Sequence, residues 1–373
     1  MQFIDLNEQF LALEAKIRED MDKVYSHKKF INGPEVKELE KQLKDFVGVK
    51  HVISCANGTD ALTIPLMAWQ LRKDDAVFVP SFTFFASAEA ISVAGGTPVF
   101  VDVDHASYNM DVPKLEEAIQ KTIQEGKLNP RGIIAVDLFG LPADYDSLQK
   151  ISQKYNLFLM EDGAQSFGAR INEGRSCSFG DVATTSFFPA KPLGCYGDGG
   201  AIFTNDDTLA DMMQSIHVHG QGSDKYDNIR IGLNSRLDTM QAVILLAKLT
   251  IFEKEIQMRN QVATEYTKRL SGMVETPVIN PGMQSAWAQY TIKVPAEKRS
   301  QIIAGLKDSD IPAMIYYPVP IHQSTAYKNL QTAMTDMSVT ENLCNVVMSL
   351  PMHPYLKTKD IAFVCDKLEE CLV

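Results

Sequence analysis

Lys191 has the most unusual surroundings of any lysine in this chain of 373 residues. It lies in the run SFFPAKPLGCYGDGG at 186–200, among aromatic residues, two prolines and four glycines. A lysine amine attacks a carbonyl only when it is neutral, and apolar surroundings disfavour its charged form. The segment therefore predicts a Schiff-base lysine that binds an aldehyde cofactor. The alternative is an ordinary loop lysine beside a glycine-rich turn.

The upstream segment 156–168 is a short apolar run that ends in two acids, Glu161 and Asp162. It predicts a buried parallel strand with Asp162 at its carboxyl end, where open α/β sheets build ligand sites. A carboxylate there can keep a pyridinium nitrogen protonated, which makes pyridoxal phosphate an electron sink. Gln165 could bond to the ring hydroxyl. Alternatively, Asp162 caps a helix that follows the strand.

The segment 49–62 predicts a strand, a small polar turn and an apolar-periodic helix. The turn holds Asn57, Gly58, Thr59 and Asp60. Free backbone N–H groups and a hydroxyl at a helix N-terminus form a site for a cofactor phosphate. An N-cap role of Asn57 or Thr59 explains the same residues. Asn57 also begins a glycosylation sequon, but nothing else indicates secretion.

The phosphate turn, the aspartate and the lysine occur in the order seen in the DegT/StrS-type sugar aminotransferases, which this chain resembles. These are fold-type-I pyridoxal phosphate enzymes that aminate nucleotide-linked keto-sugars. The resemblance covers essentially the whole chain, through GPEV at 33–36, NGTDAL at 57–62, PSFTF at 80–84, EDGAQSFG at 161–168, SFFPAK at 186–191, GDGG at 197–200, GLNSR at 232–236, YYPVP at 316–320 and LPMHPY at 350–355. The runs at 187–205 and 348–355 most resemble the enzymes that act on a UDP-linked 2-acetamido-3-keto hexuronate. Those relatives make the 3-amino uronates of bacterial surface polysaccharides such as O-antigen.

The resemblance implies a role for each matching residue at pyridoxal 5'-phosphate. Lys191 binds the cofactor covalently and moves the substrate proton, and Asp162 pairs with the pyridine nitrogen. Gln165 lies near the ring hydroxyl, and Phe84 stacks on the pyridine face. The residues implied at the phosphate and its turn are Gly58, Thr59, Asp60, Ser186 and Asn234. Asn234 is contributed by the neighbouring subunit, which implies a homodimer with shared active sites.

The residues implied on the substrate side are Arg236, Tyr316, Tyr317 and His322. The chain departs from the family at two positions nearby. Tyr316 stands where many relatives have histidine, and Val218 precedes His219 where arginine is common. The resemblance therefore implies the chemistry more directly than the exact sugar.

The composition agrees with a cytoplasmic enzyme, with 45% hydrophobic and 22% charged residues. No apolar stretch approaches the roughly 20 residues that span a bilayer, and the N-terminus lacks a basic region and cleavage site. The net charge of −11 and the absence of a basic run argue against nucleic acid. Six cysteines without metal spacing predict reduced thiols. His217 and His219 have no third ligand nearby, so we expect no metal.

Alternating apolar runs and amphipathic stretches predict an α/β fold with a mostly parallel seven-stranded sheet, flanked by helices. The expected strands lie at 51–54, 76–79, 98–103, 132–137, 157–160, 183–187 and 200–204. We expect helices at 34–46 and 245–270. The large cofactor-binding domain would cover 1–250, and a smaller α+β domain 251–373, with strands at 289–294 and 311–316 and helices at 301–306 and 358–372.

These observations predict a pyridoxal phosphate-dependent aminotransferase with two half-reactions. An amino acid, which the family suggests is glutamate, gives its amino group to the cofactor, and a nucleotide-linked keto-sugar then receives it. One alternative is a dTDP-keto-sugar aminotransferase. A second is a sugar dehydratase, but family members of that type have histidine in place of Lys191. A third is a non-catalytic regulator, which would be expected to have lost Asp162 or Lys191. A nicotinamide enzyme is disfavoured because no Gly-x-Gly-x-x-Gly follows a first strand.

Overall fold

A seven-stranded sheet forms the centre of the molecule, in a computed structural model that describes residues 1–224, 226–330, 332–333 and 335–372. The strand order is β1-β9-β8-β5-β4-β2-β3. The strands are β1 (His51–Cys55), β2 (Asp75–Pro80), β3 (Thr97–Val101), β4 (Asn129–Val136), β5 (Phe158–Asp162), β8 (Val182–Ser186) and β9 (Gly200–Thr204). All run in one direction except β9, which is antiparallel to both neighbours. The predicted α/β fold with a mostly parallel sheet is confirmed.

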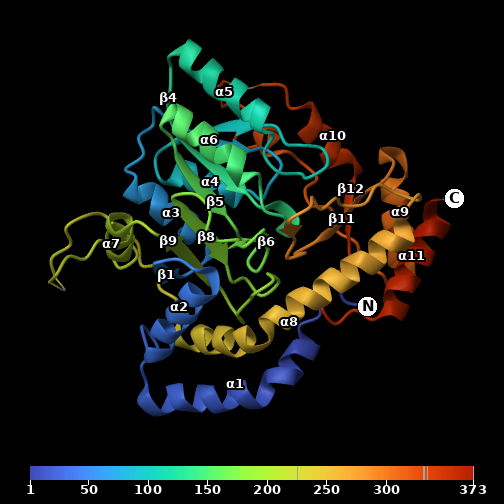
Figure 1. Cartoon of the computed structure of the whole chain (residues 1–373), viewed down its shortest axis with the longest axis horizontal. Coiled ribbons are helices and arrows are strands. Elements are labelled where there is room, and N and C mark those ends of the chain that lie inside the picture. Colours follow the sequence, from blue (N-terminus) through green and yellow to red (C-terminus); the bar gives the residue numbers. More distant parts are fainter. Residues whose placement is uncertain (225, 331, 334, 373) are drawn as a thin grey trace.

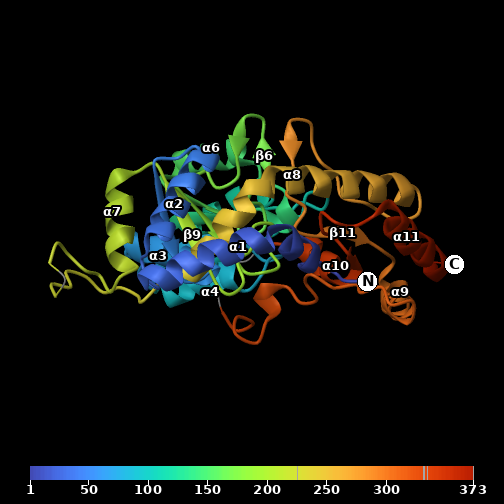
Figure 2. The same ribbon diagram turned by 90° about the horizontal axis from the view of Figure 1, so that it is seen from below.

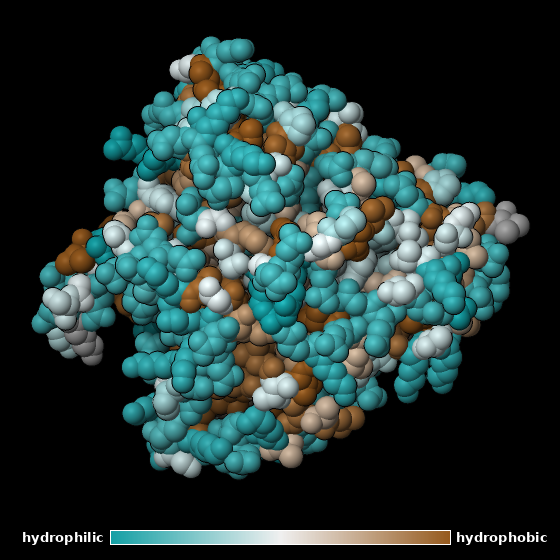
Figure 3. Space-filling model, in the orientation of Figure 1, coloured by the Kyte–Doolittle hydropathy of each residue, from teal (hydrophilic) through white to brown (hydrophobic). Residues whose placement is uncertain are grey.

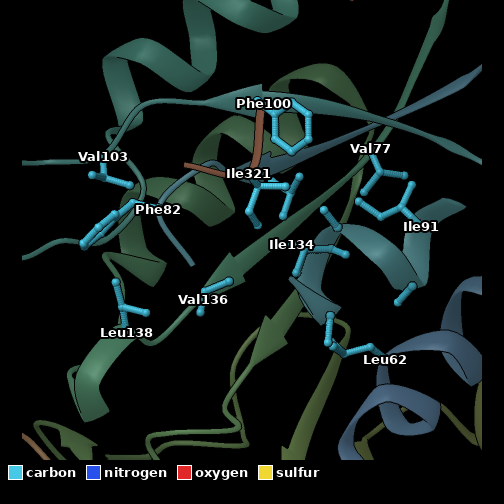
Figure 4. Close-up of a cluster of buried hydrophobic side chains, with 14 of the residues drawn as sticks. Leu62, Val77, Phe82, Ile91, Phe100, Val103, Ile134, Val136, Leu138 and Ile321 are labelled. Carbon is cyan, nitrogen blue, oxygen red and sulfur yellow. The ribbon is translucent and has the colours of Figure 1, made fainter. Parts of the chain in front are cut away.

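Both faces of this sheet are buried, because alternate residues of each strand enter different cores. Val77 of β2 lies in the core with Phe100 and Ile134 (Figure 4). Phe78, the next residue, packs on the opposite face with Leu115 and other side chains of the covering helices. Parallel strands covered on both faces are apolar along their whole length, and this is why the sequence revealed them.

Helices cover the two faces of the sheet (Figure 1). They are α2 (Pro34–Val47), α3 (Gly58–Ala68), α4 (Ala86–Val93), α5 (Val112–Glu125), α6 (Tyr145–Tyr155) and α7 (Asp207–Ile216). The expected helix at 34–46 corresponds to α2, which begins at Pro34 and ends at Gly48, a residue with φ of 86°. Pro at the first position and Gly in the left-handed region are typical of helix ends.

A long helix, α8 (Thr239–Leu270), runs from beneath the sheet to the C-terminal part of the molecule (Figures 1 and 2). The predicted helix at 245–270 corresponds to all of α8 except roughly its first turn and a half. The first helix, α1 (Asn7–His27), was not predicted, and it packs on α8 through Leu13 and Ile17. The molecular surface is mostly hydrophilic in Figure 3, where apolar side chains gather beside α1. In the described part of the chain, no helix combines the length and apolar character that a bilayer span requires.

The C-terminal part is an α+β unit, as predicted. It contains α9 (Ala296–Asp308), α10 (Ser338–Val346), α11 (Thr358–Leu372) and an antiparallel pair, β11 (Tyr290–Lys293) and β12 (Val347–Leu350). Three short strands, β6 (Arg170–Ile171), β7 (Gly174–Arg175) and β10 (Met283–Gln284), form a separate sheet. The predicted strand at 311–316 is wrong, because only Met314 pairs with β12, at Ser349. Pro312 has no N–H to continue the ladder.

The predicted domain boundary after residue 250 stays a prediction. That residue lies inside α8, which contributes Phe252 to one core and Tyr266 to the core of the C-terminal unit. Two short 3-10 turns, η1 (Leu138–Gly140) and η2 (Ile321–Gln323), lie in the core around Phe100, and Ile321 joins that core from the C-terminal third of the chain (Figure 4). The two units are therefore in direct contact.

Candidate active site

The turn after β1 leaves backbone N–H groups at the start of α3 without partners among the described residues. The side chain of Asn57 accepts a hydrogen bond from Asp60 N at 2.8 Å, and its carbonyl accepts one from Ala61 N. The Ala61 bond is the first of the helix ladder, so within the described part of the chain only the Asp60 N–H has gained a partner among the four that a helix start leaves unpaired, and those of Gly58 and Thr59 are available to a ligand. The N-cap alternative is confirmed for Asn57, and the binding of a cofactor phosphate at this turn stays a prediction.

Ser186 lies directly beside this turn. A Cβ added to Gly58 would come within 2.6 Å of Ser186 Cβ. The register of the sheet explains the contact, because Cys55 at the end of β1 and Ser186 at the end of β8 both pair with Gly200 of β9. A Cβ at Gly200 would meet the Asn57 carbonyl oxygen at 2.5 Å, so this close approach requires glycine.

Asp162 is the last residue of β5, the strand next to β8. Its side chain is 4% exposed and accepts hydrogen bonds from Ser87 Oγ at 2.7 Å and Ala164 N at 3.2 Å. Burial raises the pKa of Asp162, while these two donors and the charge of Lys191 oppose the rise. A carboxylate held in this way can stabilise a positive charge on a ring nitrogen.

Lys191 lies in the loop that follows β8, at the same edge of the sheet. Its backbone N–H donates to the Phe188 carbonyl at 2.9 Å, which forms a tight turn. Burial lowers the pKa of Lys191, and the nearby charge of Asp162 opposes that change. The neutral amine that carbonyl attack requires is thus more accessible than for a lysine in water.

Gln165, Tyr317 and Phe84 lie next to one another near these groups. Gln165 accepts from Phe139 N at 2.7 Å, and its amide nitrogen donates to the Tyr317 hydroxyl at 3.2 Å. The rings of Tyr317 and Phe84 are 6.3 Å apart, and Phe84 is 56% exposed although it is aromatic. Tyr316 adjoins Tyr317 with ring centroids 5.8 Å apart. An exposed flat ring at this edge can stack on a flat cofactor.

His322 and Arg236, which were predicted on the substrate side, make hydrogen bonds with other residues of the protein. His322 is 7% exposed, and its ring nitrogens lie 2.7 Å from Ser81 Oγ and 3.2 Å from Glu341 Oε1. Arg236 donates to Asn234 Oδ1. Their contacts with a substrate stay predictions.

Asn234 is exposed, on the segment between α7 and α8 that extends from the body as an arm (Figures 1 and 2). The next residue, Ser235, accepts from Ala56 N at 3.1 Å. The base of the arm therefore lies beside the phosphate turn of its own chain.

The sequence reasoning missed Ser87, which holds Asp162, and Phe139, which holds Gln165. Ser87 had no distinguishing sequence signal, because its burial in the apolar helix α4 is visible only in the structure. Phe139 acts through its backbone, so its side chain gave no signal. His217 bonds to the Ser235 carbonyl and to Gln214, and the described residues contain no group of three ligands suited to a metal ion.

These groups together fit pyridoxal 5'-phosphate. Two free N–H groups and the Ser186 hydroxyl suit a phosphate, and the buried Asp162 suits a ring nitrogen. The partly buried Lys191 suits an aldehyde carbon. This arrangement on an α/β sheet defines a pyridoxal phosphate-dependent transferase.

Comparisons with known proteins make the class specific. Residues 12–369 match the model of the DegT/DnrJ/EryC1/StrS aminotransferase family, and the chain belongs to that family. It is 46% identical over 99% of both chains to UDP-2-acetamido-2-deoxy-3-oxo-D-glucuronate aminotransferase of Pseudomonas aeruginosa. It is 37% identical to UDP-N-acetyl-3-dehydro-alpha-D-glucosamine 3-aminotransferase of Acidithiobacillus ferrooxidans, over 99% of this chain and 97% of the relative. A solved family member from Brucella abortus is 49% identical, with a TM-score of 0.97 over 99% of both chains.

The chain is therefore a nucleotide-sugar aminotransferase that uses pyridoxal 5'-phosphate. This agrees with the predicted family, enzyme class and cofactor.

Proposed function

We propose that this aminotransferase transfers an amino group from glutamate to the 3-keto group of UDP-2-acetamido-3-keto-hexuronate. The product would be a 3-amino uronate for a bacterial surface polysaccharide. The observation that carries this proposal is the 46% identity over nearly the full length of a relative named for a 3-oxo-glucuronate. The second relative, named for a 3-dehydro glucosamine, supports amination at the same carbon.

The residues described above would each have a separate role in this reaction. Lys191 would bind the cofactor covalently and then, once released, carry the proton at the substrate carbon. The N–H groups of Gly58 and Thr59 and the Ser186 hydroxyl would hold the phosphate, with Asp60 completing the turn. When bound, the cofactor withdraws electrons from the substrate carbon. Asp162 would sustain that withdrawal by keeping the ring nitrogen protonated, and Ser87 would keep Asp162 in place.

The substrate would approach from the side of Phe84 and Tyr317. Arg236 is the cation proposed for the nucleotide sugar, because a guanidinium binds diphosphate and carboxylate oxygens with two donors. Tyr316, Tyr317 and His322 are the other proposed contacts. With Tyr316 in place of the histidine frequent in relatives, this chain offers a phenol where many of them offer an imidazole.

A panel of nucleotide-linked amino sugars tests the substrate. Each sugar is added to the cofactor-loaded enzyme without keto acid, and loss of the visible absorption of the cofactor is followed. The UDP-linked 3-amino hexuronate should bleach it fastest. Faster bleaching by a dTDP-linked sugar would contradict the proposal and favour the dTDP alternative, and faster bleaching by a 4-amino sugar would contradict amination at carbon 3.

We also propose a homodimer with shared sites, in which Asn234 reaches the phosphate of the partner subunit. Support comes from the exposed Asn234 on an arm that projects from the body, with the exposed Ile229 and Ile231 beside it. Each site of a two-fold dimer would then combine Lys191 of one subunit with Asn234 of the other.

Mixed dimers test this arrangement. If Lys191→Ala and Asn234→Ala are each inactive, their heterodimer has one intact site. Random reassortment makes half of the dimers mixed, so activity should return to about a quarter of the wild-type value. The matched control mixes Lys191→Ala with Asp162→Asn, which restores no site because both groups come from one subunit. Verified heterodimers of the first pair that stay inactive would exclude the shared site.

A further inference from the structure

One face of α8 carries polar side chains into the interior of the protein. Gln241, Lys248 and Glu255 follow one another at intervals of seven residues, which is close to two helical turns. Lys248 is 1% exposed and Glu255 is 3% exposed. Lysine and glutamate are rarely buried so completely unless they have specific partners.

The partner of Lys248 is the loop that carries Lys191. Its Nζ donates to the Gly194 carbonyl at 2.6 Å and lies 4.4 Å from the ring centroid of Tyr196. Burial lowers the pKa of Lys248 to about 8, and Glu255 and Cys195 oppose that change. An apolar side chain would avoid this desolvation, so a role in stability alone does not explain a lysine at this position.

Gly194 connects Lys248 with the turn at Lys191. A Cβ on Gly194 would lie 2.6 Å from the carbonyl oxygens of both Phe188 and Pro189, so the backbones are in close contact. The Phe188 carbonyl is the acceptor for Lys191 N. A displacement of Gly194 would therefore move the turn that aims the Lys191 side chain.

Other hydrogen bonds hold the same loop in place. Cys195 N donates to the Phe187 carbonyl at 2.8 Å, and the side chain of Gln241 accepts from Tyr196 N at 2.9 Å. Glu255, the third of these residues on the α8 face, accepts from Gln9 of α1 and from the Tyr355 hydroxyl. The α8 face thus connects the loop with the first helix and with the C-terminal unit.

We propose that Lys248 is a positioning residue, which holds the Gly194 carbonyl and thereby fixes the 187–197 loop so that the Lys191 amine points towards the Asp162 carboxylate. The proposal rests on the proposed role of Lys191. Lys248 itself touches neither substrate nor cofactor, and Gln241 fixes the other end of the loop.

The test compares Lys248→Met with Lys248→Arg, and with the control Lys254→Met on the exposed side of the same helix. Three quantities are measured: the thermal unfolding of the cofactor-free protein, the rate at which borohydride fixes the cofactor to Lys191, and the pH midpoint of the cofactor's visible absorption. Lys248→Met should slow fixation by about tenfold and shift the pH midpoint, because small misplacements of a reacting group are costly. Lys248→Arg, which keeps a donor, should recover part of the rate.

A folded Lys248→Met protein with the fixation rate and the pH midpoint of Lys254→Met would overturn the proposal. If Lys248→Met does not fold, Gln241→Met provides the test. This variant removes the hydrogen bond to Tyr196 N at the other end of the loop, so it should also slow the fixation of the cofactor. An unchanged rate in that variant would equally count against a positioning role. Failure of the Lys191 assignment is a separate result, because borohydride would then mark another residue in the wild-type protein.

Discussion

Glu161 and Asp162, the two acids at the end of β5, are neighbours in sequence, but their side chains lie on opposite sides of the strand. Asp162 faces the edge with Lys191 and accepts from Ser87 and Ala164. Glu161 points to the other side, where it is 0% exposed and accepts from Ser176 Oγ, Cys177 N and Phe179 N. The alternation of side chains along a strand produces this separation.

The side of Glu161 contains a second carboxyl group and no basic partner among the described residues. Asp137 accepts from Ser166 Oγ at 2.6 Å, and the Tyr145 hydroxyl donates to it at 2.7 Å. Burial, and then the charge of Asp137, raises the pKa of Glu161 well above its usual value. Asp162 therefore lies beside Lys191, whereas the raised pKa of Glu161 favours its neutral form among the loops that contact it.

The largest effect should follow from Asp162→Asn. The amide cannot keep the ring nitrogen protonated, so transamination should slow by several orders of magnitude while the cofactor still binds. Single-turnover bleaching with glutamate measures the rate, and cofactor absorption measures binding. Near-normal turnover would remove Asp162 from the mechanism.

A smaller effect is expected from Ser87→Ala, which removes one hydrogen bond from the same carboxylate. A bond to a charged group contributes about 1.5–3 kcal/mol, so the rate should fall by roughly ten- to a hundredfold. Because this bond lowers the pKa of Asp162, its loss should move the acid limb of the pH-rate profile to higher pH. An unshifted limb would show that Ser87 does not tune this carboxylate.

Glu161→Gln should change stability rather than chemistry. The folded wild type keeps a proton on Glu161 that the unfolded chain releases above about pH 4.5, so its stability falls as pH rises through this range. The glutamine cannot ionise, and the melting temperature of the variant minus that of the wild type should therefore increase from pH 5 to pH 8, by about 2 °C or more. A difference independent of pH would refute the neutral-acid interpretation.

The sequence predicted the sheet well because its signals are local. Apolar runs such as 157–160 mark buried strands, and the residues at their carboxyl ends must meet at one edge. Ser87, Lys248 and Glu161 could not be predicted in their roles, since each depends on partners that lie in other segments of the fold. Ser87 is 75 residues from Asp162, and Lys248 is 54 residues from Gly194. The substrate side, including His322, and the phosphate contact of Asn234 came from resemblance alone.

Borohydride reduction followed by peptide mapping tests the central assignment most directly. The purified protein should carry the visible absorption of bound cofactor, and reduction should fix that cofactor on the peptide that contains Lys191. Lys191→Ala should lose covalent attachment and turnover together, whereas Lys254→Met should keep both. Recovery of the reduced cofactor on a different lysine would contradict the account.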